Sequence, residues 1–178
     1  MAEPLRPAAT KTYGRENWLF VTAVADITAP TAAEVNAASG IDITNIAFAD
    51  GAPAPSQSTN LATQNRRFGD TTEVQFVGTT TYAGGEMTYQ FNPQGATGDN
   101  SVKLWEKIAA GGVTGFLIRR QGVARATTPA AGQFVDVFPV EFGPSMPTKS
   151  GDGESAEAAA VCTFAVTSAP AFKKAIAA

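Results

Sequence analysis

The chain has 178 residues, a formal net charge of −3, no histidine and one cysteine. A single domain is expected at this length, with roughly two-thirds of the unfolded surface buried. The acidic balance excludes the basic footprint of tight nucleic-acid binding, and the lack of histidine removes the commonest proton shuttle and metal ligand. The one cysteine, Cys162, excludes an internal disulfide, and its apolar neighbours predict a small buried side chain.

Residues 1–15 are polar, contain two prolines and show no hydrophobic periodicity. They predict a flexible N-terminal arm ahead of one domain over residues 16–178. The first residues lack the apolar core of an export signal, and no later run approaches the roughly 20 apolar residues of a membrane span. We therefore expect no membrane partner, and a protein that stays in the cytoplasm where it is made unless a larger particle carries it out.

The first predicted elements are a strand, a short helix and a second strand. Residues 16–24 read as the first strand. Thr31 and Glu34 have the spacing of a capping box, in which the threonine hydroxyl accepts from the Glu34 amide while the glutamate reaches back. A helix of about two turns is expected to end at Gly40. Residues 41–48 alternate apolar and polar side chains, which is typical of a half-buried strand.

Residues 50–70 are the least regular interior stretch, rich in Gly, Pro, Ser and Thr and ending near an Arg66–Arg67 pair. We expect a long loop here, and such a loop in a compact domain is usually functional or ordered only by a partner. The arginine pair by itself is typical of a solvated surface and does not indicate a phosphate site.

Residues 71–91 predict a hairpin in which Val74 faces Tyr89 and Phe76 faces Met87. This register sorts the apolar residues to one face and nearly all the polar residues to the other. Because a slip of one residue would invert every side chain, the agreement favours this pairing. The polar face is then made by Glu73, Gln75, Glu86, Thr88 and Gln90.

A helix is predicted after the turn region that follows the hairpin. One of residues 99–101 can cap it, and Val102, Trp105 and Ile108 share one side. Gly111–Gly112 are expected to end it.

Three further strands are predicted at residues 113–120, 133–142 and 158–167, with a polar loop at 143–157. The first two are apolar on both faces, so each should be covered on both sides by the helix, a second sheet or another subunit. Six or seven strands and one good helix predict a mainly β protein. The expected architecture is an antiparallel β-sandwich or partial barrel with one flanking α-helix.

Catalytic and metal sites receive little support from the sequence. A Ser-His-Asp or Cys-His arrangement is impossible without histidine. Glu73 and Glu86 could be offered as the acid pair of a glycosidase, but two exposed strand carboxylates are the simpler interpretation. Asp152, Glu154 and Glu157 lack the spacing of an EF-hand loop and read as a solvated acidic loop. We expect no enzyme, no cofactor and no metal.

The predicted polar face, Glu73 to Gln90, leaves two interpretations open. It is either the solvated side of an antiparallel hairpin or the wall of a water-filled channel. Lys and Arg drive phosphate binding by neutralising charge, so a wall without them lets a polyanion slide past without docking.

Several stretches carry a resemblance to a known family. They are the polar segment before the first strand, the capped stretch 31–44, residues 135–144 ahead of a polar loop, and a closing strand that ends in Ser168–Ala169–Pro170. In these features the chain resembles the major tail proteins, or tail tube subunits, of long-tailed bacteriophages. The resemblance covers most of the chain but not residues 50–70.

The resemblance implies a tail-tube-like β-sandwich and a homo-oligomer in which hexameric rings stack into a tube. DNA would pass through the lumen without specific binding, and other tail proteins would meet the tube ends. The protein would be assembled in the host cytoplasm and end in the virion tail. Head-to-tail contacts of this kind can extend without limit, and closing a barrel across subunits removes unpaired strand edges.

The lumen-facing residues are then expected to be those of the polar face: Glu73, Gln75, Glu86, Thr88 and Gln90. A β-sandwich binding or virion decoration module is the alternative function. It predicts a stable monomer with an exposed aromatic groove, whereas the aromatic residues here sit within predicted strands.

Overall fold

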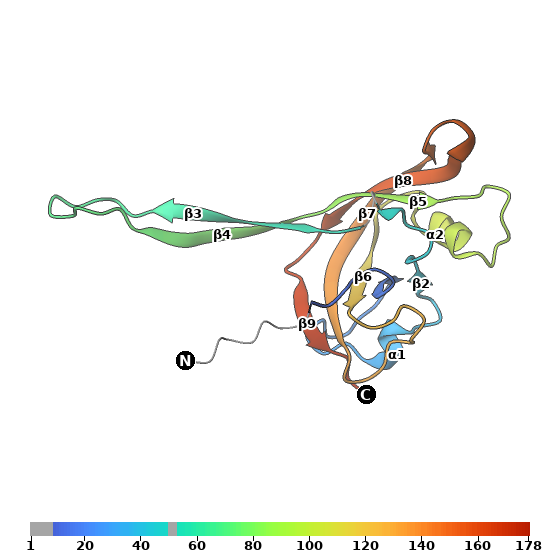
Figure 1. Cartoon of the computed structure of the whole chain (residues 1–178), viewed down its shortest axis with the longest axis horizontal. Helices are drawn as coiled ribbons and strands as arrows, with labels where there is room; N and C mark the ends of the chain where they lie inside the picture. Colours follow the sequence, from blue (N-terminus) through green and yellow to red (C-terminus); the bar gives the residue numbers. More distant parts are fainter. Residues whose placement is uncertain (1–8, 50–52) are drawn as a thin grey trace.

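Nine strands form two antiparallel sheets in residues 9–49 and 53–178, the part of the chain that the computed structural model describes (Figure 1). The large sheet has strand order β2-β1-β6-β7-β8-β5, and β9 pairs with the first part of β7; β3 and β4 form the small sheet. The strands are β1 Glu16–Val21, β2 Ile41–Asp42, β3 Ser56–Thr63, β4 Gln75–Ala83, β5 Gly85–Gln90, β6 Val113–Gln121, β7 Phe134–Ser150, β8 Glu157–Val166 and β9 Ala171–Ala175. The helical segments are α1 Ala32–Val35, α2 Asn100–Ile108 and a 3-10 turn at Gly153–Ser155.

The large sheet curls because β7 changes partner along its length. Its first part pairs with β6, from Asp136 to Phe142, and its later part pairs with β8. The register shifts between Phe142 and Ser145, and at Gly143 an added Cβ would lie 2.7 Å from the hydroxyl oxygen of Thr163. A bulge of this kind bends a strand, so the sheet folds over into the half-barrel of Figure 1.

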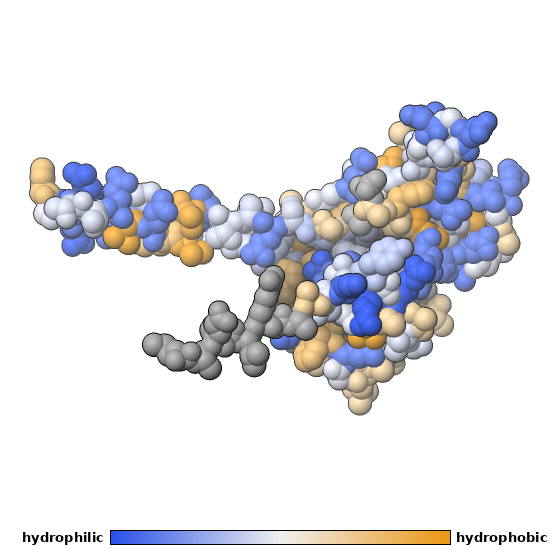
Figure 2. All heavy atoms as spheres, viewed as in Figure 1, coloured by the Kyte–Doolittle hydropathy of each residue, from blue (hydrophilic) through white to orange (hydrophobic). Residues whose placement is uncertain are grey.

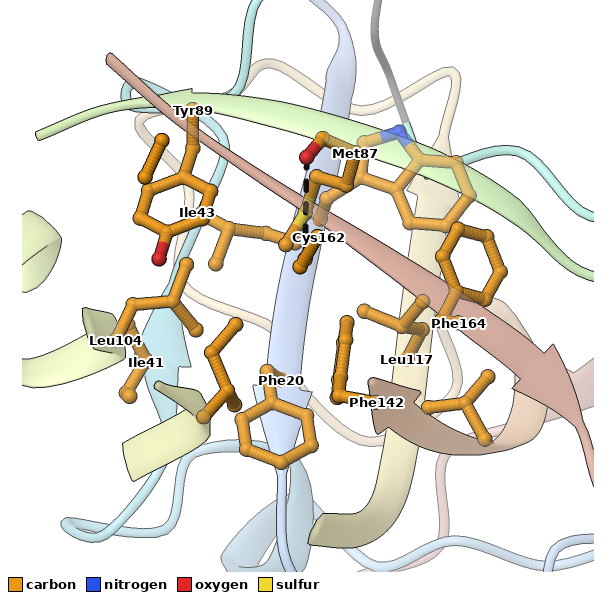
Figure 3. Packing of buried hydrophobic residues seen from close by; sticks show 14 of the residues in the cluster. Phe20, Ile41, Ile43, Met87, Tyr89, Leu104, Leu117, Phe142, Cys162 and Phe164 are labelled. Atoms are coloured by element: carbon orange, nitrogen blue, oxygen red, sulfur yellow. Dashed lines mark hydrogen bonds between the residues drawn. The ribbon is translucent and has the colours of Figure 1, made fainter. Parts of the chain in front are cut away.

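The main core lies between the two parts of the curled sheet and α2 (Figure 3). Phe20 and Phe142 meet nearly edge to face, with ring centroids 5.2 Å apart. Burying each large apolar side chain of this kind stabilises the fold by roughly 1.5–3 kcal/mol. The cluster also includes Ile41, Ile43, Met87, Tyr89, Leu104, Leu117, Cys162 and Phe164.

A second buried cluster covers the opposite face of β1, β6 and the first part of β7. Ile118 and Val137 come from the sheet, Val35 from α1, and Ile176 from the segment after β9. The expectation that these apolar strands are covered on both faces is therefore confirmed. The cover is α1 and the C-terminal segment on one side and the main core on the other.

The capping box of α1 is confirmed. The Thr31 hydroxyl accepts from the Glu34 amide, while the Glu34 carboxylate accepts from the amide and hydroxyl of Thr31 at 2.8 Å. The same carboxylate accepts from the Ala25 amide at 2.7 Å, and these hydrogen bonds lower the pKa of Glu34, the one from Ala25 most. The helix is shorter than the predicted two turns. It covers only four residues, and the chain then turns toward Gly40.

Helix α2 packs its buried face against the main core. That face consists of Ser101, Leu104 and Ile108, so it is rotated slightly from the predicted side. Trp105 is partly buried instead, and its ring stacks on Phe91 with centroids 4.3 Å apart. The predicted stop is confirmed, since Gly111 and Gly112 both have φ near +70°, which disfavours any residue with a Cβ.

These elements confirm the expected fold class: a mainly antiparallel β protein, partly closed into a barrel, with one main flanking helix. The predicted hairpin over residues 71–91 is wrong. β4 pairs with β3, and β5 pairs with β8 instead. The alternation along each strand assigned the faces correctly for β5, but alternation cannot say which other strand supplies the hydrogen bonds.

Two predicted loops are also corrected. Residues 56–63, inside the expected loop 50–70, form β3, while residues 50–52 lie outside the described residues. Within the expected polar loop 143–157, β7 continues to Ser150. Both stretches are exposed and lack a buried face, so they carry no hydrophobic period that would mark them as strands.

The expected N-terminal arm lies partly outside the described residues, because the structure describes the chain from residue 9. Residues 9–14 are exposed and contain no strand. Gly14 and Arg15 contact the loop after β6, since their carbonyls accept from the amides of Arg125 and Gly122. The division into an arm and one domain stays a prediction.

Candidate functional site

The outward face of β5 is polar, and β5 pairs with β8 in the antiparallel direction. Glu86, Thr88 and Gln90 alternate along β5 with Met87 and Tyr89, which are fully buried. Their directly opposite partners on β8 are Thr163, Val161 and Ala159, respectively. Directly opposite residues share a sheet face, so three of the five predicted polar-face residues lie together on the outside of the half-barrel.

The later part of β7 extends this face on the other side of β8. Its outward residues Met146, Thr148 and Ser150 lie opposite Val161, Ala159 and Glu157. Before the bulge, Glu141 lies opposite Ala165, which is on the same side of β8 as Thr163. We call this surface the outer face; its residues are Glu86, Thr88, Gln90, Glu141, Met146, Thr148, Ser150, Glu157, Ala159, Val161, Thr163 and Ala165.

The outer face carries three carboxylates, those of Glu86, Glu141 and Glu157, and no Lys or Arg. The only cation within β5, β7 and β8 is Lys149. It lies one position away from Thr148 and therefore on the opposite side of the strand, with its ammonium 3.3 Å from Asp152. A surface with carboxylates and no cation repels phosphate and gives it no docking point.

Buried polar groups lie directly beneath the outer face. The Tyr89 hydroxyl donates to the hydroxyl oxygen of Ser145 at 3.2 Å. The Cys162 thiol faces the Met87 carbonyl at 3.8 Å (Figure 3). Burial raises the pKa of both Tyr89 and Cys162 to about 12. These contacts join β5, β7 and β8, so the layer beneath the outer face is packed.

The free energy of unfolding is expected to fall as the pH rises from about 9 toward about 12. The pKa of the Cys162 thiol is 9.0 in its ordinary state and about 12 in the fold. Between these two pH values the folded chain keeps a thiol proton that the unfolded chain has lost, so rising pH favours the unfolded chain. Urea unfolding at several pH values measures the slope. Cys162→Ala should reduce it, and a slope that is unchanged in this variant would contradict the assignment.

Glu73 and Gln75 are not brought to the outer face. Glu73 precedes β4, and Gln75 lies opposite Thr63 in the small sheet. Glu73 therefore does not lie across a strand pair from Glu86. The structure gives no support to a glycosidase acid pair formed by these two residues.

Glu141 and Glu157 belong to the outer face but are missing from the predicted set. The sequence predicts a polar loop at Glu157, and the apolar residues on both sides of Glu141 do not indicate which face of the sheet it shares. The alternation of Thr163, Phe164 and Ala165 indicates which side of β8 faces outward. It bears on Glu141 only once β8 is known to lie between β5 and β7.

The half-barrel has an unfinished edge beside the outer face. On the side away from β8, the last backbone hydrogen bond of β7 runs from the Ser145 amide to the Ala109 carbonyl. In the described residues, 146–150 have no strand on that side. Proline is tolerated at such an edge because it cannot donate to a neighbouring strand, and within residues 146–150 only Pro147 lacks an amide proton. The free side of β5 is partly covered, since the Gln90 amide donates to the Ile46 carbonyl.

Other site types find no support in residues 9–49 and 53–178. No group of three or more acidic, cysteine or histidine side chains is placed to hold a metal ion there. Among the helices in those ranges, none has the length and apolar character needed to cross a membrane.

The fold and its outer face define a mainly β protein that presents a cation-free sheet surface beside an open strand edge. A family model described as phage tail tube protein matches residues 4–178, so the chain belongs to the phage tail tube protein family. A comparison with curated sequences finds no match. The family is one of structural tail proteins and not of enzymes, so the resemblance seen in the sequence is confirmed and the protein is a structural component of the virion tail.

Proposed function

We propose that six copies of this chain form a ring, that rings stack into the tail tube, and that DNA passes through the lumen without specific binding. Membership of the tail tube family supplies the assembly into a multi-subunit tube with other tail proteins. One observation supports the proposed DNA conduit: the outer face of β5, β8 and the end of β7 has no cation.

Ring closure would use the open edge of β7. Residues 146–150 would receive a strand from the neighbouring copy, so that the half-barrels join into one continuous barrel. This contact is head-to-tail, and rotation about the tube axis closes it into a ring. Closure also removes an edge that would otherwise promote aggregation.

The lumen surface would be the outer face. We restrict the predicted lumen residues to Glu86, Thr88 and Gln90, because Glu73 precedes β4 and Gln75 lies in the small sheet. We add Glu141 and Glu157, which belong to the outer face. Six copies would multiply the carboxylates around the bore. DNA would then meet a wall that releases no counterions on contact and so does not retain it.

The test places a cation on the outer face. Tubes of Glu86→Lys, assembled in the presence of short labelled duplex DNA, are expected to retain DNA at low salt and to release it at high salt. Wild-type tubes are expected to retain none above background. Co-sedimentation of label with the tubes, measured over a salt series, reads out the retention.

Glu106→Lys is the matched control. It makes the same change of charge on the exposed side of α2, away from the outer face. An isolated cation on an open surface binds weakly, whereas a ring of cations in a narrow bore focuses the field. Equal DNA retention by the two variants, or no retention by Glu86→Lys tubes, would show that the outer face does not line the lumen.

A further inference from the structure

The β3–β4 ribbon, residues 56–83, extends away from the large sheet and joins it through Gly84 (Figure 1). In the space-filling view the ribbon is a narrow arm that meets the body at one end (Figure 2). All of β3 is exposed, and β4 is exposed over most of its length. Because so little of the ribbon is covered, its direction relative to the body depends on the contacts at its base.

The base of the ribbon rests on Phe172 of β9. The ring of Tyr82, close to the end of β4, lies 6.3 Å from the ring of Phe172. Phe172 in turn packs edge to face against Phe138 of the main core, with ring centroids 5.8 Å apart. In the described part of the chain, no other pair of aromatic rings joins the ribbon to the body. Phe172 therefore connects the ribbon to the core.

The residue after Phe172 has an unusual backbone conformation. Lys173 has a φ of +51°, and in residues 9–49 and 53–178 it is the one residue other than glycine with a positive φ. A Cβ disfavours this left-handed conformation, so surrounding contacts must hold it in place. The pairing of β9 with β7 is irregular at the same point, where the register shifts between Val135 and Val137.

Asp136, the residue at that shift, supplies the contact. One carboxylate oxygen accepts from the Lys173 amide at 2.8 Å, and the other accepts from the Arg119 guanidinium at 2.9 Å. The guanidinium lies 5.6 Å from the ring centres of both Trp18 and Phe138. The carboxylate is thus fixed to β6 on one side while it holds the backbone of β9 on the other.

We propose that Asp136 and Lys173 form a clasp that fixes Phe172 beneath the ribbon and so sets the direction of the ribbon. All of these contacts lie within one chain, so the inference does not depend on the proposed tube. The nine residues of β4 span about 30 Å at roughly 3.3 Å per residue. A rotation of about 10° at the base would move the far end of such a strand by about 5 Å. A strained residue at the base therefore has a large effect at the far turn.

Double electron–electron resonance on the full chain tests the clasp. Nitroxide labels are attached at Gly69→Cys near the far turn and at Glu106→Cys on the exposed side of α2, and the native Cys162 is 2% exposed and stays unlabelled. The labelled chain is kept dilute enough for light scattering to report a monomer. It is expected to give one narrow distance distribution. Phe172→Ala and Asp136→Ala are each expected to widen this distribution at least two-fold.

Phe134→Ala is the matched control. Phe134 is 52% exposed, against 42% for Phe172, and its ring contacts the Lys173 ammonium rather than the ribbon. Its loss is expected to leave the distance distribution unchanged. Asp136→Asn keeps a side-chain oxygen for the Lys173 amide, so this variant is expected to retain the narrow distribution that Asp136→Ala loses.

A broad distribution in the labelled chain without further changes, or a narrow one in Phe172→Ala, would overturn the inference, as would equal widening in Phe134→Ala. Urea unfolding of each variant separates a change of ribbon direction from a loss of the fold. If Asp136→Ala does not fold, the comparison of Phe172→Ala with Phe134→Ala decides the inference. A chain that forms no tubes leaves these measurements unchanged, so the two proposals fail independently.

Discussion

Arg120→Met is expected to lower the free energy of unfolding by roughly 3 kcal/mol, because several buried acceptors lose their donor at once. Arg120 is 1% exposed. Its guanidinium donates to the side-chain oxygens of Gln133 at 2.7 Å and Asn17 at 2.8 Å, and to the carbonyls of Ala124 and Thr127. Methionine fills a similar volume but donates nothing to these groups.

The arginine is held by neutral acceptors rather than by a carboxylate. Burial lowers the pKa of Arg120, and among the described residues its hydrogen bonds go to amide and carbonyl oxygens alone. Its buried Nε has no partner there. The side chain therefore acts as a tie between β1, β6 and the loop before β7, and its loss should loosen that loop.

Arg119→Met is the control, and urea unfolding measures both variants. Arg119 is the preceding residue on β6 and points to the other face, where it is 26% exposed and pairs with Asp136 at 2.9 Å. A partly exposed ion pair contributes about 1 kcal/mol or less. Equal losses in the two variants would contradict a special role for the buried arginine.

Gly84→Val is expected to destabilise the fold by roughly 2–4 kcal/mol and to prevent tube assembly. Gly84 joins β4 to β5, and an added Cβ would lie 1.8 Å from the Phe164 carbonyl oxygen and 2.6 Å from its carbon. These are backbone atoms of β8, so they cannot move without separating β5 from β8. This junction connects the small sheet of β3 and β4 to the outer face, so both should be displaced.

Gly98→Val provides the matched control, since an added Cβ at Gly98 meets no atom within 4 Å. Its free energy of unfolding is expected to stay within about 0.5 kcal/mol of wild type. Urea unfolding and electron microscopy of assembled material read out the two variants. Normal tubes from Gly84→Val would mean that the junction adapts and that the close approach does not matter for assembly.

Part of the outer face could be predicted from the sequence because local periodicity determines it. The alternation along residues 85–90 placed Glu86, Thr88 and Gln90 on a solvated face, and this holds even though the predicted partner strand was wrong. Glu73 and Gln75 were grouped with them only through that wrong pairing. The side of a strand on which a residue lies is local, whereas the identity of the neighbouring strand depends on contacts far away in the sequence.

By itself, the sequence determined the β-rich class, the capping box at Thr31 and Glu34, the glycine stop after α2 and the lack of a basic surface. These depend on neighbouring residues or on composition, which folding does not change. Only the tertiary structure decided that β5 pairs with β8, that Glu141 of β7 and Glu157 of β8 share one acidic surface with Glu86, and that β3 and β4 leave the body as a ribbon. The physical reason is that β3 and the end of β7 have no buried face, so no hydrophobic period in their residues records the strands they form.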